Sequence, residues 1–278
     1  MTGKRFAVHI LAHENPQLFG DLVASLRHPQ IDVYAHIDAK SPQAPFAAAA
    51  NGAVRFVPEP VRVYWGGRSQ VTATLASLAQ AGHGYHRHSL LSGADVLLRP
   101  LDEVVSCWSD DAERIRIDAR LDAPDRPHRY RMNRLHFPEQ PALHRISGRI
   151  PRPVPRGVPL CQGSQWWSLT GAAVRHLRTR LRREPGWFAA FRGTLGADEI
   201  VFHSLLADSP YASAIVPPAP DVHGQHFIDW SQPPYRHPAP LTEADLPRAL
   251  ASGALFARKV GADWTWRDTG AAVDTERR

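Results

Sequence analysis

The amino-acid sequence predicts an α/β fold in which a mixed, mostly parallel sheet carries helices on both faces. Two patterns lead to this prediction: short apolar runs typical of buried strands, and segments of about ten to fifteen residues that read as helices. Because the two kinds of segment alternate along the amino-terminal part, consecutive strands are expected to lie parallel, with helices crossing between them.

The amino-terminal part supplies most of the predicted sheet. Apolar strands are predicted at residues 5–13, 31–38, 53–59 and 88–95. A helix is predicted at 16–28 with Asn15 as its N-cap, because asparagine followed by proline is a common helix start. A second helix is predicted at 68–82, capped by Ser69 and ended by Gly82.

The remaining chain is predicted to alternate between order and loops. After residues 113–121, the segment 122–160 is rich in Pro and Arg, lacks clear periodicity and is expected to form long loops or a lid. Regular structure is expected again from 163 onward, with a polar tail at 267–278. A chain of 278 residues with these patterns predicts one domain over residues 1–266.

The composition is that of an ordinary globular protein, with 43% hydrophobic residues. No run approaches the ~20 apolar residues of a membrane span, so neither a signal peptide nor an anchor is expected. The two cysteines, Cys107 and Cys161, exclude a disulfide framework and a four-cysteine zinc site. A reducing, cytoplasmic location fits this cysteine content best.

The charge of the chain predicts an anionic partner. The formal net charge is +6, and arginines crowd between Arg114 and Arg156. Nucleic acid, an anionic membrane surface and a nucleotide diphosphate all fit this charge. No nucleic-acid-binding motif is visible, so no nucleic-acid partner is predicted, and membrane contact is expected to be peripheral at most.

Two acidic residues, Asp198 and Glu199, precede a short segment with a broad apolar face. The structural interpretation is that Asp198 caps this helix and that both acids complement its dipole. The functional interpretation is that one of them is a catalytic acid or base. The two residues alone favour the structural interpretation.

Asp38 and Asp95 each follow an apolar strand and are therefore expected in the ligand crevice of the sheet. Sugar-nucleotide enzymes that use a metal usually place two acids one residue apart after such a strand, so that both reach a cation on the diphosphate. The turn here, "SGADVLL", has one acid, so no metal site is predicted.

Basic residues offer another way to hold a diphosphate. Arg258 and Lys259 follow Phe256 in an apolar segment, and Arg236 lies upstream. Adjacent basic residues usually belong to a solvated surface. In a strand, however, successive side chains alternate between faces, so either Arg258 or Lys259 is expected to point inward or into a cleft.

Aromatic residues are the candidates for a sugar platform. Trp166 and Trp167 follow Ser164, and in a strand one of them would pack in the core while the other stayed free to contact a sugar ring. The equally favoured alternative is that both rings pack in the core. Trp65 precedes two glycines, which allow close backbone approach or simply make a turn.

Taken in order, eight segments resemble the core-2/I-branching β-1,6-N-acetylglucosaminyltransferase family, which includes the peptide O-xylosyltransferases. The resemblance runs from about Arg5 to Gly261. Its carriers are "ILAHENPQLFGDL", "YAHIDAKSP", "VYWGGRSQVTATLASL", "LLSGADVLLRPLDEV", "GSQWWSLTGAAV", "GADEIVFHSLLADSP", "FIDWS" and "LFARKVG". Each segment is a weak signal alone, but together, in order, they are specific.

The resemblance implies a GT-A-like (Rossmann-like) fold and an inverting transfer from a UDP-sugar to a hydroxyl of a glycan acceptor, with no metal and no cofactor besides the donor. It implies that Glu199 is the base and that Arg236 and Lys259 hold the diphosphate. The other residues expected on the donor side are His13, Asp38, Asp95 and Arg258. Those expected on the acceptor side are Trp65, Ser164, Trp166, Trp167 and Asp198.

The chain also departs from the family pattern. Animal members carry several disulfides and a membrane anchor, so this chain resembles a bacterial, cytoplasmic relative. Ser204 and Asp208 stand where the family more often has Thr and Asn. The expected donor sugar is GlcNAc. Xylose, another UDP-sugar, a different donor class and a basic anion-binding protein that kept only the fold are the alternatives.

Overall fold

The computed structural model describes residues 3–121, 128–154, 159–231, 238–261 and 264. The described helices are α1 (Pro16–Ser25), α2 (Gln43–Ala50), α3 (Arg68–Ala81), α4 (Leu101–Trp108), α5 (Tyr130–Asn133), α6 (Gly171–Arg183), α7 (Pro185–Ala189), α8 (Val201–Ala207) and α9 (Leu246–Ala251). Short 3₁₀ helices are η1 (Pro141–Ile146), η2 (Ala197–Glu199), η3 (Ala212–Ala214) and η4 (Glu243–Asp245). The described strands are β1 (Phe6–Ala12), β2 (Ile31–Ile37), β3 (Val54–Phe56), β4 (Arg87–Ser92), β5 (Val96–Leu97), β6 (Ile117–Arg120), β7 (Cys161–Gly163), β8 (Ser168–Thr170), β9 (Val222–His223), β10 (His226–Ile228) and β11 (Phe256–Arg258).

The main sheet has the strand order β3-β2-β1-β4-β8. Strands β3, β2, β1 and β4 are parallel, with Phe6 of β1 opposite Ile31 of β2 and Arg87 of β4. Strand β8 closes the edge antiparallel to β4. The predicted mixed, mostly parallel sheet is therefore confirmed, and the parallel strands place their carboxyl ends at one edge, where ligands bind in such folds.

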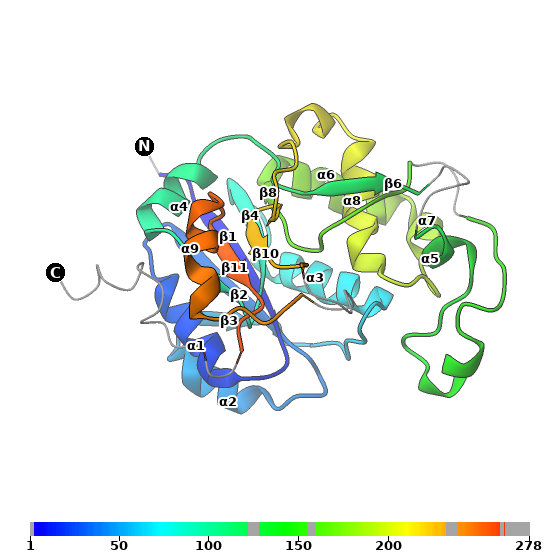
Figure 1. Ribbon diagram of the computed structural model, residues 1–278, viewed down its shortest axis with the longest axis horizontal. Coiled ribbons are helices and arrows are strands. Elements are labelled where there is room, and N and C mark those ends of the chain that lie inside the picture. The colour runs from blue at the N-terminus through cyan, green and yellow to red at the C-terminus, as the bar shows by residue number, and fades with distance from the viewer. Residues whose placement is uncertain (1–2, 122–127, 155–158, 232–237, 262–263, 265–278) are drawn as a thin grey trace.

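Helices cover both faces of this sheet, as predicted. The even-numbered residues of β1, Phe6, Val8 and Ile10, pack in one buried cluster with side chains of α1, α2 and α4. Side chains of α3 and α6 form a second cluster, on the opposite face, together with Leu90 of β4. In Figure 1 α1, α2 and α4 accordingly lie away from α6 and α8, with the sheet between them.

A second sheet is built from β5 and three strands of the carboxyl-terminal part of the chain. Its order is β5-β11-β10-β9, with β10 and β11 parallel to each other and antiparallel pairs at both ends. Strands β6 and β7 form a separate antiparallel pair. The second sheet brings the end of β11 beside the loop that follows β4, since the Val260 N–H donates to the Ala94 carbonyl (3.1 Å).

Helix α1 begins as the sequence predicts, because the Asn15 side chain accepts from the Leu18 N–H (3.2 Å) and Pro16 is the first helical residue. The predicted cap of α3 is wrong. Its N-cap is Gly67, and the Ser69 hydroxyl accepts from the Tyr64 N–H (2.9 Å) in the preceding loop. Gly82 ends α3 as predicted.

The described part of the predicted loop region 122–160 contains little regular structure beyond α5 and η1. It is held by backbone bonds, including one from the Arg152 N–H to the Asn133 carbonyl (2.9 Å). In Figure 1 this segment extends at the side of the molecule beyond α7. The predicted tail 267–278 lies outside the described residues.

Candidate functional site

Glu199 lies in η2, on a turn that two glycines bring against the loop before α3. Gly196 (φ 74°) and Gly66 (φ 68°) have backbone conformations that favour glycine, and the Gly196 N–H donates to the Gly66 carbonyl (2.7 Å). A Cβ on Gly196 would lie 2.9 Å from the Arg131 Nη1. The absence of a side chain at Gly196 therefore leaves room for Arg131 beside Glu199.

The Glu199 carboxylate is partly exposed and forms an ion pair with Arg131 of α5, whose Nη1 donates to Oε2. Burial is the largest single effect and would lower the pKa of Arg131, but the charge and hydrogen bond of Glu199, together with Tyr130, outweigh it and raise the pKa above its ordinary value. Arg131 comes from the segment that the sequence predicts as loops or a lid. It is a site residue that sequence reasoning missed.

Asp198 is buried beside Glu199, and within the described residues its Oδ1 has no hydrogen-bond partner. Burial, together with the neighbouring Glu199 charge, raises the pKa of Asp198 to about 7. The interpretation of Asp198 as a helix cap is wrong. Helix α8 begins at Val201 after Ile200, and no side-chain cap bond is formed there among the described residues.

Trp65 lies in the loop that contacts the Glu199 turn, directly before Gly66. Its side chain is 65% exposed, which makes it the largest exposed aromatic surface among the described residues. The Gly66 N–H donates to the Gln70 Oε1 (2.7 Å), and the Gln70 amide reaches the Gln165 Oε1 at 3.5 Å. Gln70 therefore links the Trp65 loop to the segment that carries Trp166.

Arg258, at the end of β11, points inward as the alternation along the strand predicts. Its guanidinium lies 3.9 Å from the centre of the Trp166 ring, and its Nε is 3.7 Å from Asp95. Burial lowers the pKa of Arg258, and the Asp95 charge opposes this effect. Even so, a guanidinium stays protonated in proteins, so Arg258 remains a cation held in a fixed position.

Asp95 is completely buried and accepts hydrogen bonds from neighbouring buried groups. The Ser92 N–H (2.8 Å), the Ser92 hydroxyl (2.5 Å) and the His226 Nε2 (3.0 Å) all donate to its carboxylate. Burial alone would raise the pKa of Asp95, but His226 and Arg258 outweigh it and hold the pKa below the ordinary value. The expectation that Asp95 projects into the crevice is wrong, because its carboxylate is occupied in fixing Arg258.

Asp38 likewise uses its carboxylate for internal hydrogen bonds. It is buried after β2 and accepts from the Lys40 N–H (2.9 Å) and the Val63 N–H (3.3 Å). The Lys40 ammonium donates to the Val63 carbonyl (2.6 Å) and lies over the Tyr64 ring. Asp38 and Lys40 therefore hold the chain that leads into Trp65.

His13 and Lys259 share an acidic neighbour at the carboxyl edge of the main sheet. Glu14 joins them, since its Oε1 is 3.3 Å from the Lys259 Nζ and 3.7 Å from the His13 Nε2. The Ser41 hydroxyl also donates to the His13 carbonyl (2.7 Å), which ties the end of β1 to the loop after Asp38. The predicted donor residues His13, Asp38 and Lys259 are thus neighbours, and Glu14 is an addition that the sequence analysis missed.

Trp166 and Trp167 are both buried, so the equally favoured alternative of two core residues is the better description. Trp167 packs against Phe202 of α8, and Trp166 is covered on one face by Arg258. Both precede β8 rather than lying in a strand. Ser164 accepts from the Trp166 N–H (3.4 Å) and, through its carbonyl, from His203 (2.8 Å), so it shapes this turn.

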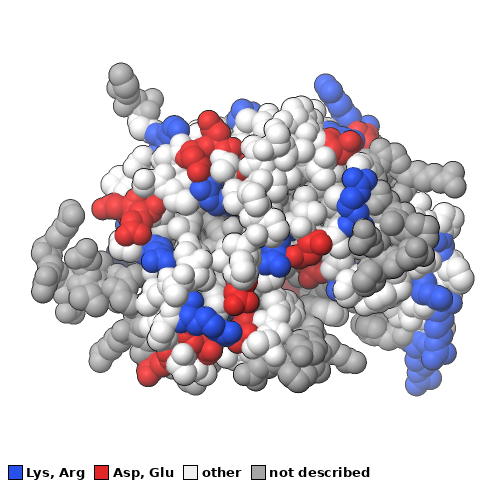
Figure 2. All heavy atoms as spheres, turned by 45° about the horizontal axis from the view of Figure 1, so that its top comes forward, with Lys and Arg blue, Asp and Glu red and all other residues white. Residues whose placement is uncertain are grey.

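Figure 2 shows acidic and basic side chains interspersed on the face that it presents. No group of three or more His, Cys, Asp or Glu side chains among the described residues has an arrangement that would hold a metal ion. Arg236, the third predicted diphosphate ligand, lies outside the described residues.

Comparison with known proteins identifies the family. The chain matches the Core-2/I-Branching enzyme family over residues 6–249. It belongs to this family. The resemblance noted in the sequence is confirmed, and the chain is a glycosyltransferase with a GT-A-like fold, for which the family implies a UDP-sugar donor and an acceptor substrate.

No curated protein matches the chain. Within the described residues, every helix is too short or too polar to cross a bilayer.

Proposed function

We propose that this family member transfers GlcNAc from its UDP-sugar to a hydroxyl of a glycan acceptor, with inversion at the anomeric carbon and without a metal ion. The observation that carries the proposal is the partly exposed Glu199 carboxylate, which pairs with Arg131 and follows the buried Asp198 in a turn bonded to the loop of the exposed Trp65. A positioned carboxylate of this kind suits a general base.

The proposed reaction assigns separate tasks to these residues. Glu199 accepts the proton of the acceptor hydroxyl as its oxygen attacks the anomeric carbon, while Arg131 orients the carboxylate through Oε2. Trp65 offers a ring face for an apolar side of a sugar. A protonated Asp198 leaves one negative charge on the acidic pair.

The leaving UDP needs positive charge where negative charge develops. Lys259 at the sheet edge and Arg258 over Trp166 supply it, and we assign Arg236 to the same task. The Asp95 carboxylate is already paired with Arg258 and accepts a hydrogen bond from His226. This use of Asp95 favours a diphosphate held by basic side chains over one held by a cation.

A content of only two cysteines in 278 residues suits a reducing compartment, so we propose the cytoplasm as the place of action.

Glu199→Gln tests the role of Glu199. Because a positioned base contributes ~10²- to 10⁴-fold, the variant is expected to lose at least ~10²-fold in transfer while it still binds UDP. Glu103→Gln, an exposed residue in the first turn of α4, is the matched control and should transfer normally. Near-wild-type transfer by Glu199→Gln would contradict the assignment.

The donor is identified with a panel of UDP-GlcNAc, UDP-xylose, UDP-glucose and UDP-galactose. Hydrolysis of each by the wild-type protein reports donor choice without knowledge of the acceptor. Fastest hydrolysis of UDP-GlcNAc is expected. A preference for UDP-xylose would replace GlcNAc by the alternative and leave the role of Glu199 unaffected.

A further inference from the structure

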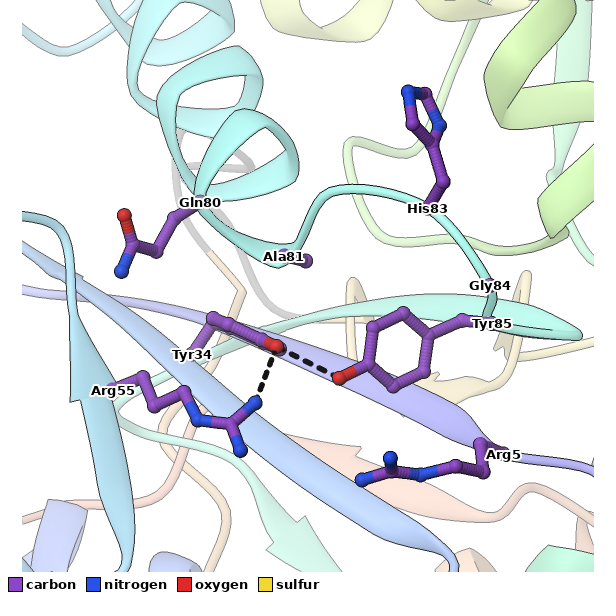
Figure 3. A pocket seen from close by; sticks show the side chains of 8 residues that line it. All are labelled: Arg5, Tyr34, Arg55, Gln80, Ala81, His83, Gly84 and Tyr85. Atoms are coloured by element: carbon purple, nitrogen blue, oxygen red, sulfur yellow. Dashed lines mark hydrogen bonds between the residues drawn. The ribbon is translucent and has the colours of Figure 1, made fainter.

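A cavity of about 340 Å³ lies at the edge of the main sheet opposite to the donor residues. Arg5 precedes β1 and Tyr85 precedes β4, so the cavity opens at the amino ends of the parallel strands. Figure 3 shows that Gln80 and His83, at the end of α3 and just after it, lie across the cavity from Arg5 and Arg55. The proposed transfer reaction does not use this cavity.

The wall of the cavity is a directed chain of hydrogen bonds. The Tyr85 hydroxyl donates to the Asp32 Oδ2 (2.7 Å), because a carboxylate can only accept. Tyr85 therefore accepts from Tyr34 (2.7 Å), and Tyr34 accepts from the Arg55 Nη1 (2.7 Å). Burial raises the pKa of Tyr85 above its ordinary value, so its phenol stays neutral and remains a donor.

This chain of hydrogen bonds holds two guanidinium groups in place. Tyr34 and Tyr85 are buried, and Arg5 and Arg55 both form ion pairs with Asp32, the second at 3.5 Å. Arg5 also lies over the Tyr85 ring and Arg55 over the Tyr34 ring. In Figure 3 the two guanidinium groups extend toward one another from opposite sides of the cavity.

The charge on this cavity is not balanced. One carboxylate, Asp32, is shared by two guanidiniums whose side chains are 53% and 57% exposed. In the described structure each guanidinium donates one hydrogen bond, so most of its five N–H groups face solvent or the cavity. His83 and Gln80 add polar groups on the far side.

We propose that this cavity is a second ligand site, which binds a phosphate group. Guanidiniums fork onto pairs of phosphate oxygens, and here two of them are pre-oriented by buried tyrosines. The cavity is larger than a phosphate ion, so it has room for the organic part of a small phosphomonoester. Free phosphate and a phosphomonoester share this chemistry, and the experiment distinguishes them.

The test is calorimetric titration with inorganic phosphate and, separately, with glycerol 3-phosphate, at an ionic strength fixed with sodium chloride. In the double variant Arg5→Gln/Arg55→Gln the affinity is expected to fall by at least ~10-fold, since each lost charged hydrogen bond is worth about that factor. Arg27→Gln, an exposed arginine after α1, should leave the affinity unchanged. Tighter binding of glycerol 3-phosphate would identify the ligand as a phosphomonoester, and tighter binding of inorganic phosphate would identify it as free phosphate.

Lys259→Ala separates this site from the donor residues. The proposal expects phosphate binding to survive in Lys259→Ala and to weaken in the double variant. The opposite pattern would place the anion at the donor edge and overturn the proposal, as would unchanged affinity in the double variant. The outcome does not depend on whether the protein transfers GlcNAc.

A footprint on the wild-type protein keeps the proposal testable if the double variant does not fold. Phenylglyoxal modifies accessible arginines, and the modified residues are identified by mass spectrometry. Phosphate is expected to protect Arg5 and Arg55 and to leave Arg27 reactive. Equal modification of all three with and without phosphate would overturn the proposal.

Discussion

Asp198 and Glu199 are neighbours in the sequence and have opposite surroundings. The Asp198 side chain is buried without a partner for Oδ1 among the described residues, whereas the Glu199 side chain is 32% exposed and paired with Arg131. Two adjacent charges of the same sign cost free energy, and burial adds to that cost for Asp198. The pair therefore favours one proton on Asp198, which leaves the exposed carboxylate to meet the acceptor.

Asp198→Asn tests this division through the pH dependence of stability. The pKa of Asp198 is raised from 3.8 to about 7 in the folded protein, so its contribution to stability is complete below the lower value and is lost as the pH rises toward the higher one. Asparagine does not titrate. As the pH rises from 3.8 toward 7, the free energy of unfolding of the variant should therefore increase relative to that of wild type.

Urea unfolding at a series of pH values measures this difference. Asp111→Asn, whose carboxyl is 91% exposed, is the control and should differ from wild type by a constant amount. A constant difference for Asp198→Asn as well would mean that Asp198 titrates normally. A loss of stability at every pH would restore a structural role.

At the scale of elements, the sequence predicts those segments whose pattern is local. Helix α1 has a recognisable cap, and α8 buries the apolar face that its spacing predicts. The sequence pattern does not predict helix α2, because its alanine-rich segment has no alternation of polar and apolar residues, although alanine is the strongest helix former. Helix α4 and strand β5 are likewise not predicted by the sequence analysis.

The site residues can likewise be predicted only where their sequence signal is local. Glu199, Lys259 and Arg258 are recognised from motifs, but Arg131 comes from a segment without periodicity, and only the tertiary fold brings it to Glu199, 68 residues away. Asp95 was misplaced for a related reason. Its position after a strand is evident from the sequence, but the donation from His226, 131 residues away, is not.

The segment that joins β7 to β8 gives a prediction about its two tryptophans. Trp167→Ala should destabilise the protein by ~3–5 kcal/mol, since it removes a buried ring packed against Phe202, and should leave UDP affinity unchanged in the folded fraction. Trp166→Ala should lower UDP affinity, because Arg258 loses the ring beneath it.

Unfolding and UDP titrations measured side by side check this division. Trp166→Phe keeps a ring face and should recover most of the UDP affinity. Equal stability losses in Trp166→Ala and Trp167→Ala, with no change in UDP affinity, would reduce both residues to core packing.

At the scale of the whole molecule, the parallel sheet has a candidate ligand site at each edge. The carboxyl edge collects His13, Asp38 and Lys259, and the amino edge carries Arg5 and Arg55. The basic side chains at these two edges therefore form separate local groups and not one continuous binding surface. A small anion fits such groups better than a nucleic acid does.

The last prediction is that transfer does not depend on a metal ion. Negative charge builds on UDP as the glycosidic bond breaks, and a preorganised positive charge must stabilise it. Asp95 is committed to Ser92, His226 and Arg258, so its carboxylate is poorly placed to hold a cation. Activity should therefore survive millimolar EDTA and should not rise with Mn²⁺ or Mg²⁺.

If no metal ion takes part, the positive charge that stabilises the leaving UDP must come from side chains. Lys259→Ala tests this requirement. Loss of one preorganised donor costs ~10²- to 10³-fold, so the variant should show slower transfer and weaker UDP binding, and Arg236→Ala should behave in the same way. Glu14→Gln, which removes the acidic partner of Lys259, should not weaken UDP binding. Loss of activity in EDTA with recovery on Mn²⁺, together with normal activity of Lys259→Ala, would assign the diphosphate to a cation and return Lys259 to the solvated surface.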